Sequence, residues 1–468
     1  MMGTALRYGS LILLLVTVSV SLVVHGDEIK PQTRAALVDQ LQILRLYDPS
    51  FNRDYEQASQ MSTAELVASL PMLAQRVQAF WSRHGLRLPY ASLPDNASLS
   101  TRIIALEPKV PDYLNVLSRV RYLMWLADHH TMPEIALDGW LRPGDSHPAI
   151  TAIEQRLSLL GDLRTTARQI TQYDEVLAQA VKHFQKRHGL KEDAVIGPNT
   201  LRWLQVSPEA RARLLVKNFL EKSELLAKLG DRYLIVNIPA FELVLVDDAK
   251  IQLKSKVIVG KTARQTPLLH GEISNVIMNP TWRVPRRILR QDLVPQIRKN
   301  GEYLQDRNFE VFDFDGNLIN MSDQEWQSEA LGKFPYRLVQ KPGKDNALGK
   351  FKFHFANDFD IYLHDTPDVE LFQKDNRALS SGCIRVEKVD ELAAWFADHL
   401  VKDKRTWNKL LTNEAKTQWF SLNETLPVYL VYWTAWVDEQ HVAQFRSDVY
   451  GLEAPNELST KYDNQLRH

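Results

Sequence analysis

The chain has 468 residues, with 57 basic and 57 acidic side chains and a hydrophobic content of 44%. A chain of this length is expected to form about two to four domains. The composition is that of a folded protein and excludes a disordered or fibrous one. The balanced charge gives no electrostatic basis for a nucleic-acid partner.

Residues 1–26 are typical of a secretory signal. A start with one arginine and no acidic residue precedes a 14-residue apolar run, Leu11 to Val24. A membrane span needs about 20 apolar residues, so this run is short for one. If the signal stays uncleaved, residues 8–25 anchor the protein in the membrane. Either way, the body of the protein is expected to be exported.

Helical patterns follow the signal. Residues 27–145 have apolar residues at three- and four-residue spacing, which predicts a helical scaffold. Residues 146–206 predict a three-helix unit, with helix stops at Gly161 and Gly189 and a short closing helix. Residues 207–231 predict an amphipathic linker helix.

Two histidines of the three-helix unit, His183 and His188, could suggest a zinc site. Their spacing of five residues does not place them on one face of a helix, as a spacing of four would. We therefore expect one packed and one exposed histidine, and no metal.

From residue 232 the pattern changes to alternating β-branched residues, which predicts a mostly β domain over 232–400. A long insertion at about 283–335 has its own helix and hairpin, as expected of a lid. Its Asp-x-Asp-Gly-Asn run is not a calcium loop, because glycine stands fourth instead of sixth. Residues 401–468 predict a helix and a hairpin. The predicted fold class is multidomain α+β.

Cys383 is the only cysteine in the chain. Exported compartments are oxidising, and cysteines there usually pair as disulfides, which a single cysteine cannot do within one chain. It is therefore either an inert buried residue or a thiol with a function.

A histidine is expected to lie near this thiol. His364 lies on a predicted strand, on the same face as Tyr362, and Cys383 follows 19 residues later, after a loop. Free cysteine has a pKa of about 8.5 and histidine of about 6.5, so a sheltered pair can exist as thiolate and imidazolium.

The residues around the thiol fit nucleophilic attack on a carbonyl carbon. The backbone N–H groups of a tight turn formed by Ser381, Gly382 and Cys383 can stabilise the resulting oxyanion. A papain-like protease is excluded, because its cysteine precedes its histidine in the chain.

The stretches "YLHDTP" and "RALSSGCIRVE" together resemble the catalytic signature of L,D-transpeptidases with a YkuD-like catalytic domain. The stretches "NPTWRVP" and "QKPGKDNALGKFKF" agree with this resemblance. Residues 146–206 resemble the small three-helix peptidoglycan-binding module. The similarity is greatest to the large Gram-negative subgroup with a helical scaffold and a lid insertion. Many members have histidine where this chain has Ser381, which leaves His364 as the only nearby candidate base.

The resemblance implies a cysteine acyltransferase of peptidoglycan. Cys383 would attack the carbonyl of the third stem residue, meso-diaminopimelate, and expel D-alanine. The thioester would pass to the side-chain amine of a second stem, giving a third-to-third cross-link. His364 would act as base and then acid, with its ring oriented by the backbone carbonyl of Asp365. Tyr362, Arg385 and Trp282 are expected substrate contacts.

The resemblance also implies the partners and the compartment. The partners are donor and acceptor stem peptides, with a carbapenem as covalent inhibitor; no cofactor or metal is required. The compartment is the periplasm. Two alternatives stay open: an L,D-carboxypeptidase that uses the same acyl-enzyme, and a non-catalytic wall-binding scaffold in which Cys383 is inert.

Overall fold

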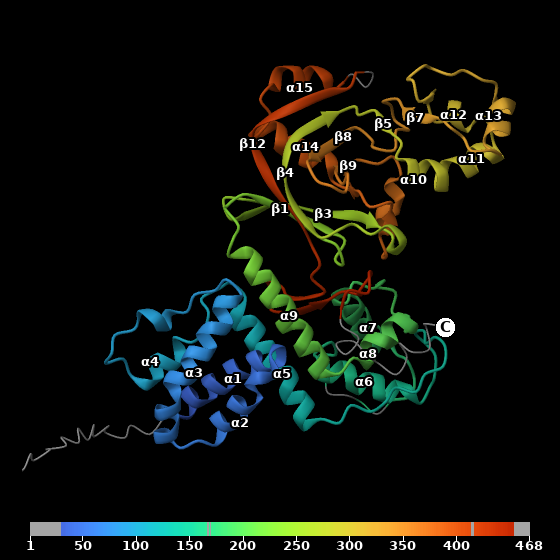
Figure 1. Ribbon diagram of the computed structural model, residues 1–468. Helices are drawn as coiled ribbons and strands as arrows, with labels where there is room; N and C mark the ends of the chain where they lie inside the picture. The colour runs from blue at the N-terminus through green and yellow to red at the C-terminus, as the bar shows by residue number, and fades with distance from the viewer. Residues whose placement is uncertain (1–29, 166–167, 169, 413–415, 454–468) are drawn as a thin grey trace, which may run out of the picture.

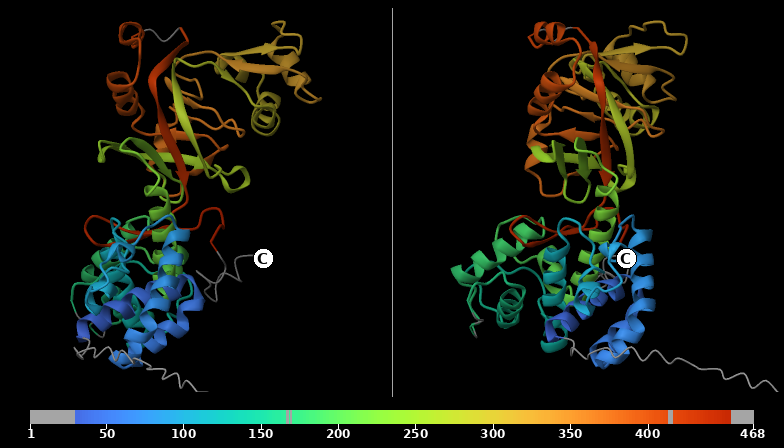
Figure 2. Two further views of the ribbon diagram at one scale, coloured as in Figure 1. Left: turned by 60° about the vertical axis from the view of Figure 1, so that its left-hand side comes forward. Right: turned by 90° about the vertical axis from the view of Figure 1, so that its left-hand side faces the viewer.

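A computed structural model describes residues 30–165, 168, 170–412 and 416–453. It has a helical lobe and a sheet lobe, joined through helix α9 (Pro208–Leu226) (Figures 1 and 2). The predicted signal or anchor at 1–26 lies outside the described residues. Within the described part of the chain, no helix has both the length and the apolar character that crossing a bilayer requires. The predicted multidomain α+β class is confirmed.

The first part of the helical lobe is a bundle of amphipathic helices. Its longest helix, α3, begins at a capping box in which Ser62 and Glu65 satisfy each other's backbone N–H groups. The helices are α1 (Pro31–Tyr47), α2 (Asn52–Gln60), α3 (Thr63–Arg83), α4 (Leu99–Ile104) and α5 (Tyr113–His129). Their apolar faces share one core with the rest of the lobe.

The three-helix unit consists of α6 (Ala149–Leu160), α7 (Glu175–Arg187) and α8 (Pro198–Gln205). Helix α6 ends at Gly161, whose φ of 83° is the left-handed conformation that a helix stop requires. His188 is buried and His183 is partly exposed beside Asp162. The described residues contain no group of side chains that could hold a metal ion.

Helix α9 is more than a linker. Its apolar residues are buried in the same core as the other helices, and its Arg211 is fully buried. Arg211 donates to the backbone carbonyls of Val206 and Trp203, which satisfies its guanidinium inside the lobe. The helix is therefore part of the core of the helical lobe, and β1 of the sheet is the next element after it.

The sheet lobe is built on nine strands in the order β10-β3-β11-β9-β8-β4-β12-β1-β2. A further pairing of β2 with β3 closes eight of them, all except β10, into a ring. The strands are β1 (Tyr233–Asn237), β2 (Glu242–Asp247), β3 (Lys250–Gly260), β4 (Leu269–Met278), β8 (Phe351–Phe355), β9 (Leu363–His364), β10 (Ala378–Ser380), β11 (Ile384–Val386) and β12 (Gln418–Val431). Helices α14 (Val389–His399) and α15 (Lys404–Leu410) pack against the core of this ring.

Strand β12 departs from the predicted C-terminal hairpin. It runs parallel to β1 and antiparallel to β4, so it lies inside the sheet, beyond the predicted boundary at residue 400. The hairpin begins only afterwards, as β13 (Ala435–Val437) and β14 (Ala443–Phe445), and packs on the helical core. The C-terminal segment thus contributes to both lobes.

The insertion between β4 and β8 has its own core and its own three-stranded sheet, and lies to one side of the main sheet (Figure 1). Its elements are β5 (Trp282–Arg283), α10 (Arg286–Ile288), a π-helical turn (Leu289–Leu293), α11 (Val294–Lys299), α12 (Tyr303–Asp306), β6 (Phe309–Phe312), α13 (Asp323–Glu329) and β7 (Arg337–Gln340). We call residues 283–335 the lid, as predicted from the sequence.

Candidate active site

Three neighbouring strands place polar side chains in a row. In the register of β8, β9 and β11, His364 lies opposite Lys352 on one side and opposite Arg385 on the other. Strand β8 buries Phe351, Phe353 and Phe355, so Lys352 points to the other face. That face carries the candidate site.

A second row lies next to the first. Strand alternation puts Tyr362 on the face of His364, and Cys383 on the face of Arg385. The ring centroids of Tyr362 and His364 are 5.6 Å apart, and the Lys352 ammonium lies 3.7 Å from the centre of the Tyr362 ring. The thiol and the imidazole therefore occupy adjacent rows of one sheet face.

The His364 ring is held in one orientation. Its Nδ1 lies 2.5 Å from the backbone carbonyl oxygen of Asp365, which can only accept a hydrogen bond. Nδ1 must therefore carry the proton, and Nε2 keeps a free lone pair. Burial, followed by the positive charge of Arg385, lowers the pKa of His364 to about 3. The ring is thus a neutral base at physiological pH.

The side chain of Asp365 stabilises the turn before β8. Its carboxylate accepts from the backbone N–H groups of Lys350 (2.7 Å) and Thr366 (2.6 Å). Gly349 adopts a φ of 57°, and a Cβ there would lie 2.2 Å from the carboxylate. Glycine at this position therefore leaves room for the Asp365 carboxylate, which stabilises the turn. The backbone carbonyl of the same residue orients His364.

Cys383 is held as a neutral thiol. Burial raises its pKa, whereas hydrogen bonds from Tyr362 and the charge of Lys352 lower it to a smaller extent. Its sulfur lies 3.6 Å from the carbonyl oxygen of Asp360, and no hydrogen bond joins thiol and imidazole in the described part of the chain. The sequence-based expectation of a thiolate and imidazolium pair does not hold for this resting structure, because burial disfavours both charges.

The turn before the thiol requires glycine. Gly382 has a φ of 120°, which strains any residue with a side chain. Its N–H donates to the Ser380 hydroxyl (3.1 Å), which in turn donates to the Cys383 carbonyl (2.6 Å). The Gly382 N–H is therefore excluded as an oxyanion donor, because it already donates to Ser380. The N–H groups of Ser381 and Cys383 remain as the candidate donors.

Two residues that the sequence did not indicate support this turn. The Thr266 hydroxyl donates to the carbonyl of Gly382 (2.7 Å) and accepts from the N–H of Gly260 (2.9 Å). The Tyr450 hydroxyl accepts from the N–H of Thr266 (3.1 Å) and donates to the carbonyl of Gly260 (2.6 Å). The nucleophile turn is thus tied to the C-terminal segment.

Replacing Thr266 with valine should lower the rate of acylation at Cys383 about tenfold. Valine has a similar shape, but it leaves the Gly382 carbonyl and the Gly260 N–H buried without partners, at about 1–3 kcal/mol each. Thr266→Ser should restore most of the rate, because serine keeps the hydroxyl. The measurement is the single-turnover rate of acyl-enzyme formation; an unchanged rate in the valine variant would show that this support is dispensable.

Arg264 links the turn to the lid. Its guanidinium donates to the Ser381 hydroxyl (2.7 Å) and to Gln291 (2.6 Å), and forms an ion pair with Asp292. Gln291 and Asp292 belong to the π-helical turn of the lid. The position of the lid is therefore coupled to the residue next to Gly382.

The predicted substrate contacts lie at the site. Trp282 lies beside the Tyr362 hydroxyl, and its ring packs on Phe309 of the lid. Arg385 pairs with Asp368 (2.9 Å). Glu387, two residues further along the chain, pairs with Lys256 (3.5 Å). The structure brings Trp282, Tyr362 and Arg385 to the same face as Cys383.

Lys352 is a site residue that the sequence analysis missed. Burial lowers its pKa, and the nearby Cys383 and Asp360 oppose this shift. The alternation in "GKFKFHF", with phenylalanine at every second position, was the available signal. A cation beside the thiol can pair with a substrate carboxylate and stabilise a developing thiolate.

These features define a class of site: a single thiol, an oriented neutral imidazole, and backbone N–H groups at Ser381 and Cys383 that have no acceptor among the described residues, as a cysteine acyl-transfer reaction requires. Comparison with known proteins agrees. Residues 231–407 match the L,D-transpeptidase catalytic domain of the YkuD family, and residues 146–204 match a family described as "Putative peptidoglycan binding domain". Residues 231–407 are thus similar to an L,D-transpeptidase catalytic domain, and they follow a segment that is similar to a peptidoglycan-binding module.

One relative of known description is similar to a part of the chain. A Haemophilus influenzae protein described as "Putative L,D-transpeptidase" is 38% identical over 220 residues, which cover 47% of this chain and 44% of that protein. The match therefore spans less than half of the relative's length.

Solved structures with the same kind of description were also found. An L,D-transpeptidase of Stackebrandtia nassauensis is 15% identical and covers 64% of this chain and 97% of its own, with a TM-score of 0.24. The catalytic domain of an E. faecium L,D-transpeptidase, acylated by ertapenem, is 12% identical and covers 43% and 98%, with a TM-score of 0.21.

Proposed function

We propose that the protein is an L,D-transpeptidase that forms third-to-third cross-links between peptidoglycan stem peptides through a thioester on Cys383. The observation that carries the proposal is the neutral His364 imidazole, with its Nε2 lone pair free, on the same sheet face as the only thiol of the chain. A catalytic domain of this family and a peptidoglycan-binding-type module support the substrate class.

In the first half-reaction, Cys383 attacks the carbonyl carbon of the third stem residue. The thiol proton passes to Nε2 of His364 as the sulfur–carbon bond forms, so neither group need be charged at rest. The N–H groups of Ser381 and Cys383 stabilise the oxyanion. The bond to the terminal D-alanine breaks, and His364 returns the proton to the leaving amine.

In the second half-reaction, the side-chain amine of an acceptor stem attacks the thioester. His364 takes a proton from this amine, and the free thiol is regenerated. If water replaces the amine, the same acyl-enzyme yields the L,D-carboxypeptidase product. We also propose that the reaction takes place in the periplasm and that a carbapenem acylates Cys383.

Lys352 and Arg385 would hold the carboxylates of the donor stem. Both cations lie in the row of His364, next to the row of the thiol. Trp282 and the lid would cover the bound peptide and exclude water, which favours transfer over hydrolysis.

Product analysis tests the proposal. Purified protein is incubated with disaccharide-tetrapeptides, with and without an added amine acceptor, and the products are separated by liquid chromatography with mass detection. Third-to-third dimers are the expected product. Tripeptides alone would identify a carboxypeptidase, and no product together with an unreactive thiol would identify the non-catalytic scaffold; both outcomes overturn the proposal.

A further inference from the structure

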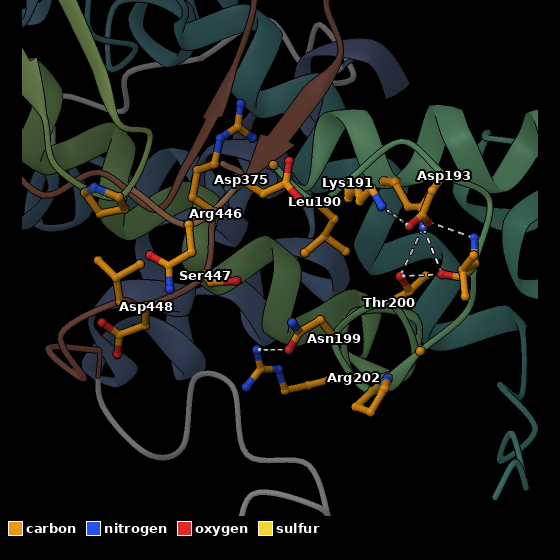
Figure 3. Close-up of a pocket in the computed structure, with 18 of the residues that line it drawn as sticks. Leu190, Lys191, Asp193, Asn199, Thr200, Arg202, Asp375, Arg446, Ser447 and Asp448 are labelled. Atoms are coloured by element: carbon orange, nitrogen blue, oxygen red, sulfur yellow. Dashed lines mark hydrogen bonds and ion pairs between the residues drawn. The ribbon is translucent and has the colours of Figure 1, made fainter. Parts of the chain in front are cut away.

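A cavity that does not include Cys383 lies where the two lobes meet. It has a volume of about 540 Å³, within the range of ligand sites. Its walls come from Trp140, the three-helix unit, the turn between β1 and β2, the loop before β10 and the C-terminal segment. Figure 3 labels residues of the three-helix unit, the loop before β10 and the C-terminal segment. Pro239, Phe241, Asp375 and Asn376 belong to the catalytic domain.

An exposed tryptophan forms part of the lining. Trp140 is 58% exposed although it is large and apolar. Its ring packs against Gly197, where a Cβ would lie 2.5 Å from a ring atom. The backbone therefore supports one side of the ring, and the exposed side can stack on the apolar face of a sugar.

Polar side chains with unused hydrogen-bonding groups line the same cavity. Asn199 accepts from Arg202, and Asn376 accepts from the N–H of Ala378. Neither side-chain NH₂ group has an acceptor among the described residues, so both can donate to a ligand. The exposed carboxylate of Asp375 offers an acceptor. This set suits the hydroxyl and acetamido groups of an amino sugar.

The charges of the lining argue against an anionic ligand. Three cationic side chains are balanced by three carboxylates: Lys191, Arg202, Arg446, Asp193, Asp375 and Asp448. Lys191 pairs with Asp193 (3.4 Å), and the Arg446 guanidinium binds backbone carbonyls and lies over Trp436. A neutral polar ligand therefore fits better than a phosphate or a free peptide rich in carboxylates.

We propose that this cavity binds the neutral amino-sugar backbone of the peptidoglycan strand that carries the donor stem. The inference rests on the proposed function and adds a glycan subsite shared by the module and the catalytic domain.

Two walls of the cavity continue into the nucleophile turn. Asn376 is followed by β10, which ends one residue before Ser381. The segment that contributes Ser447 and Val449 continues into Tyr450, which holds Thr266 and through it Gly382. A sugar bound here would touch both segments that position the turn, so glycan binding and acylation are expected to be coupled.

Binding is tested with the full chain and a neutral, peptide-free oligomer of β-1,4-linked N-acetylglucosamine, such as chitotetraose, which carries no carboxylate. Titration should show binding to the wild type. Trp140→Ala and the double variant Asn199→Ala/Asp375→Ala should each weaken it about tenfold or more, which corresponds to about 1.4 kcal/mol. Trp125→Ala is the matched control, because Trp125 is also exposed (46%) but lies on α5, outside the cavity. Thermal unfolding checks that each variant is folded.

No binding by the wild type, or equal binding by the folded cavity variants, would overturn the inference. Stronger binding of a free stem peptide that depends on Trp140 would also overturn it, because the cavity would then be a peptide site. Acylation of Cys383 by a free tetrapeptide separates the two proposals: if it occurs without glycan binding, only the glycan subsite fails. In the cavity variants, KM should rise for the sugar-bearing donor and stay unchanged for the free tetrapeptide.

Discussion

Replacing Cys383 with alanine is expected to lower dimer formation by at least about 10⁴-fold, because removing the nucleophile ends covalent catalysis. The chain has no second thiol that could take over. The measurement is the amount of cross-linked dimer formed from disaccharide-tetrapeptides over time. Cys383→Ser should remain close to this background, because a hydroxyl is a much weaker nucleophile than a thiol at neutral pH.

The loss should not come from unfolding. Cys383 is only partly buried and its side chain is small, so alanine removes few contacts. The melting temperature should therefore stay close to that of the wild type. A folded alanine variant that still forms dimers at the wild-type rate would contradict the proposed mechanism.

Replacing His364 with alanine is expected to lower the acylation rate about 10²- to 10⁴-fold, the usual contribution of a general base. The thiol would stay, so slow labelling by a thiol reagent should persist. The matched control is His399→Ala, since His399 is exposed at the end of α14 and its Nδ1 lies against the backbone carbonyl of Trp395. Single-turnover acylation by a tetrapeptide donor gives the rates. Equal rates for His364→Ala and His399→Ala would remove His364 from the mechanism.

The pH dependence of acylation follows from the same geometry. Burial and Arg385 depress the pKa of His364 to about 3, so the ring stays a neutral base throughout the neutral range. Burial raises the pKa of Cys383 above its ordinary value, so the thiol stays protonated there. The rate should therefore be nearly flat between about pH 5 and about pH 8. A loss of rate on acidification with a midpoint near the ordinary histidine value of about 6.5 would show that the imidazole is not desolvated in this way.

Local patterns predicted the centre of the site. Strand alternation placed Tyr362 and His364 on one face, and the residues next to the thiol predicted a tight turn of Ser381, Gly382 and Cys383. Both are properties of a few consecutive residues. The helical regions and the lid could be predicted for the same reason, because their periodicity and turn residues are visible within short windows.

Long-range partners could not be predicted in this way. Thr266 and Tyr450 are separated from Gly382 by many residues, and their role appears only once the sheet has closed. The apolar alternation of β12 fits a hairpin and a central strand equally well, and pairing with β1 and β4 decides between them. The pKa of His364 depends on burial and on Arg385. The ordinary pKa values of histidine and cysteine therefore predicted the wrong resting charges for this pair.

The most direct test of the central claim is the mass of the protein after a short reaction with a tetrapeptide donor. An increase equal to the donor minus D-alanine, carried by the peptide containing Cys383 and removed by neutral hydroxylamine, is the expected result. Efficient formation of dimers or tripeptides with no adduct at Cys383, or with the adduct on another residue, would contradict it.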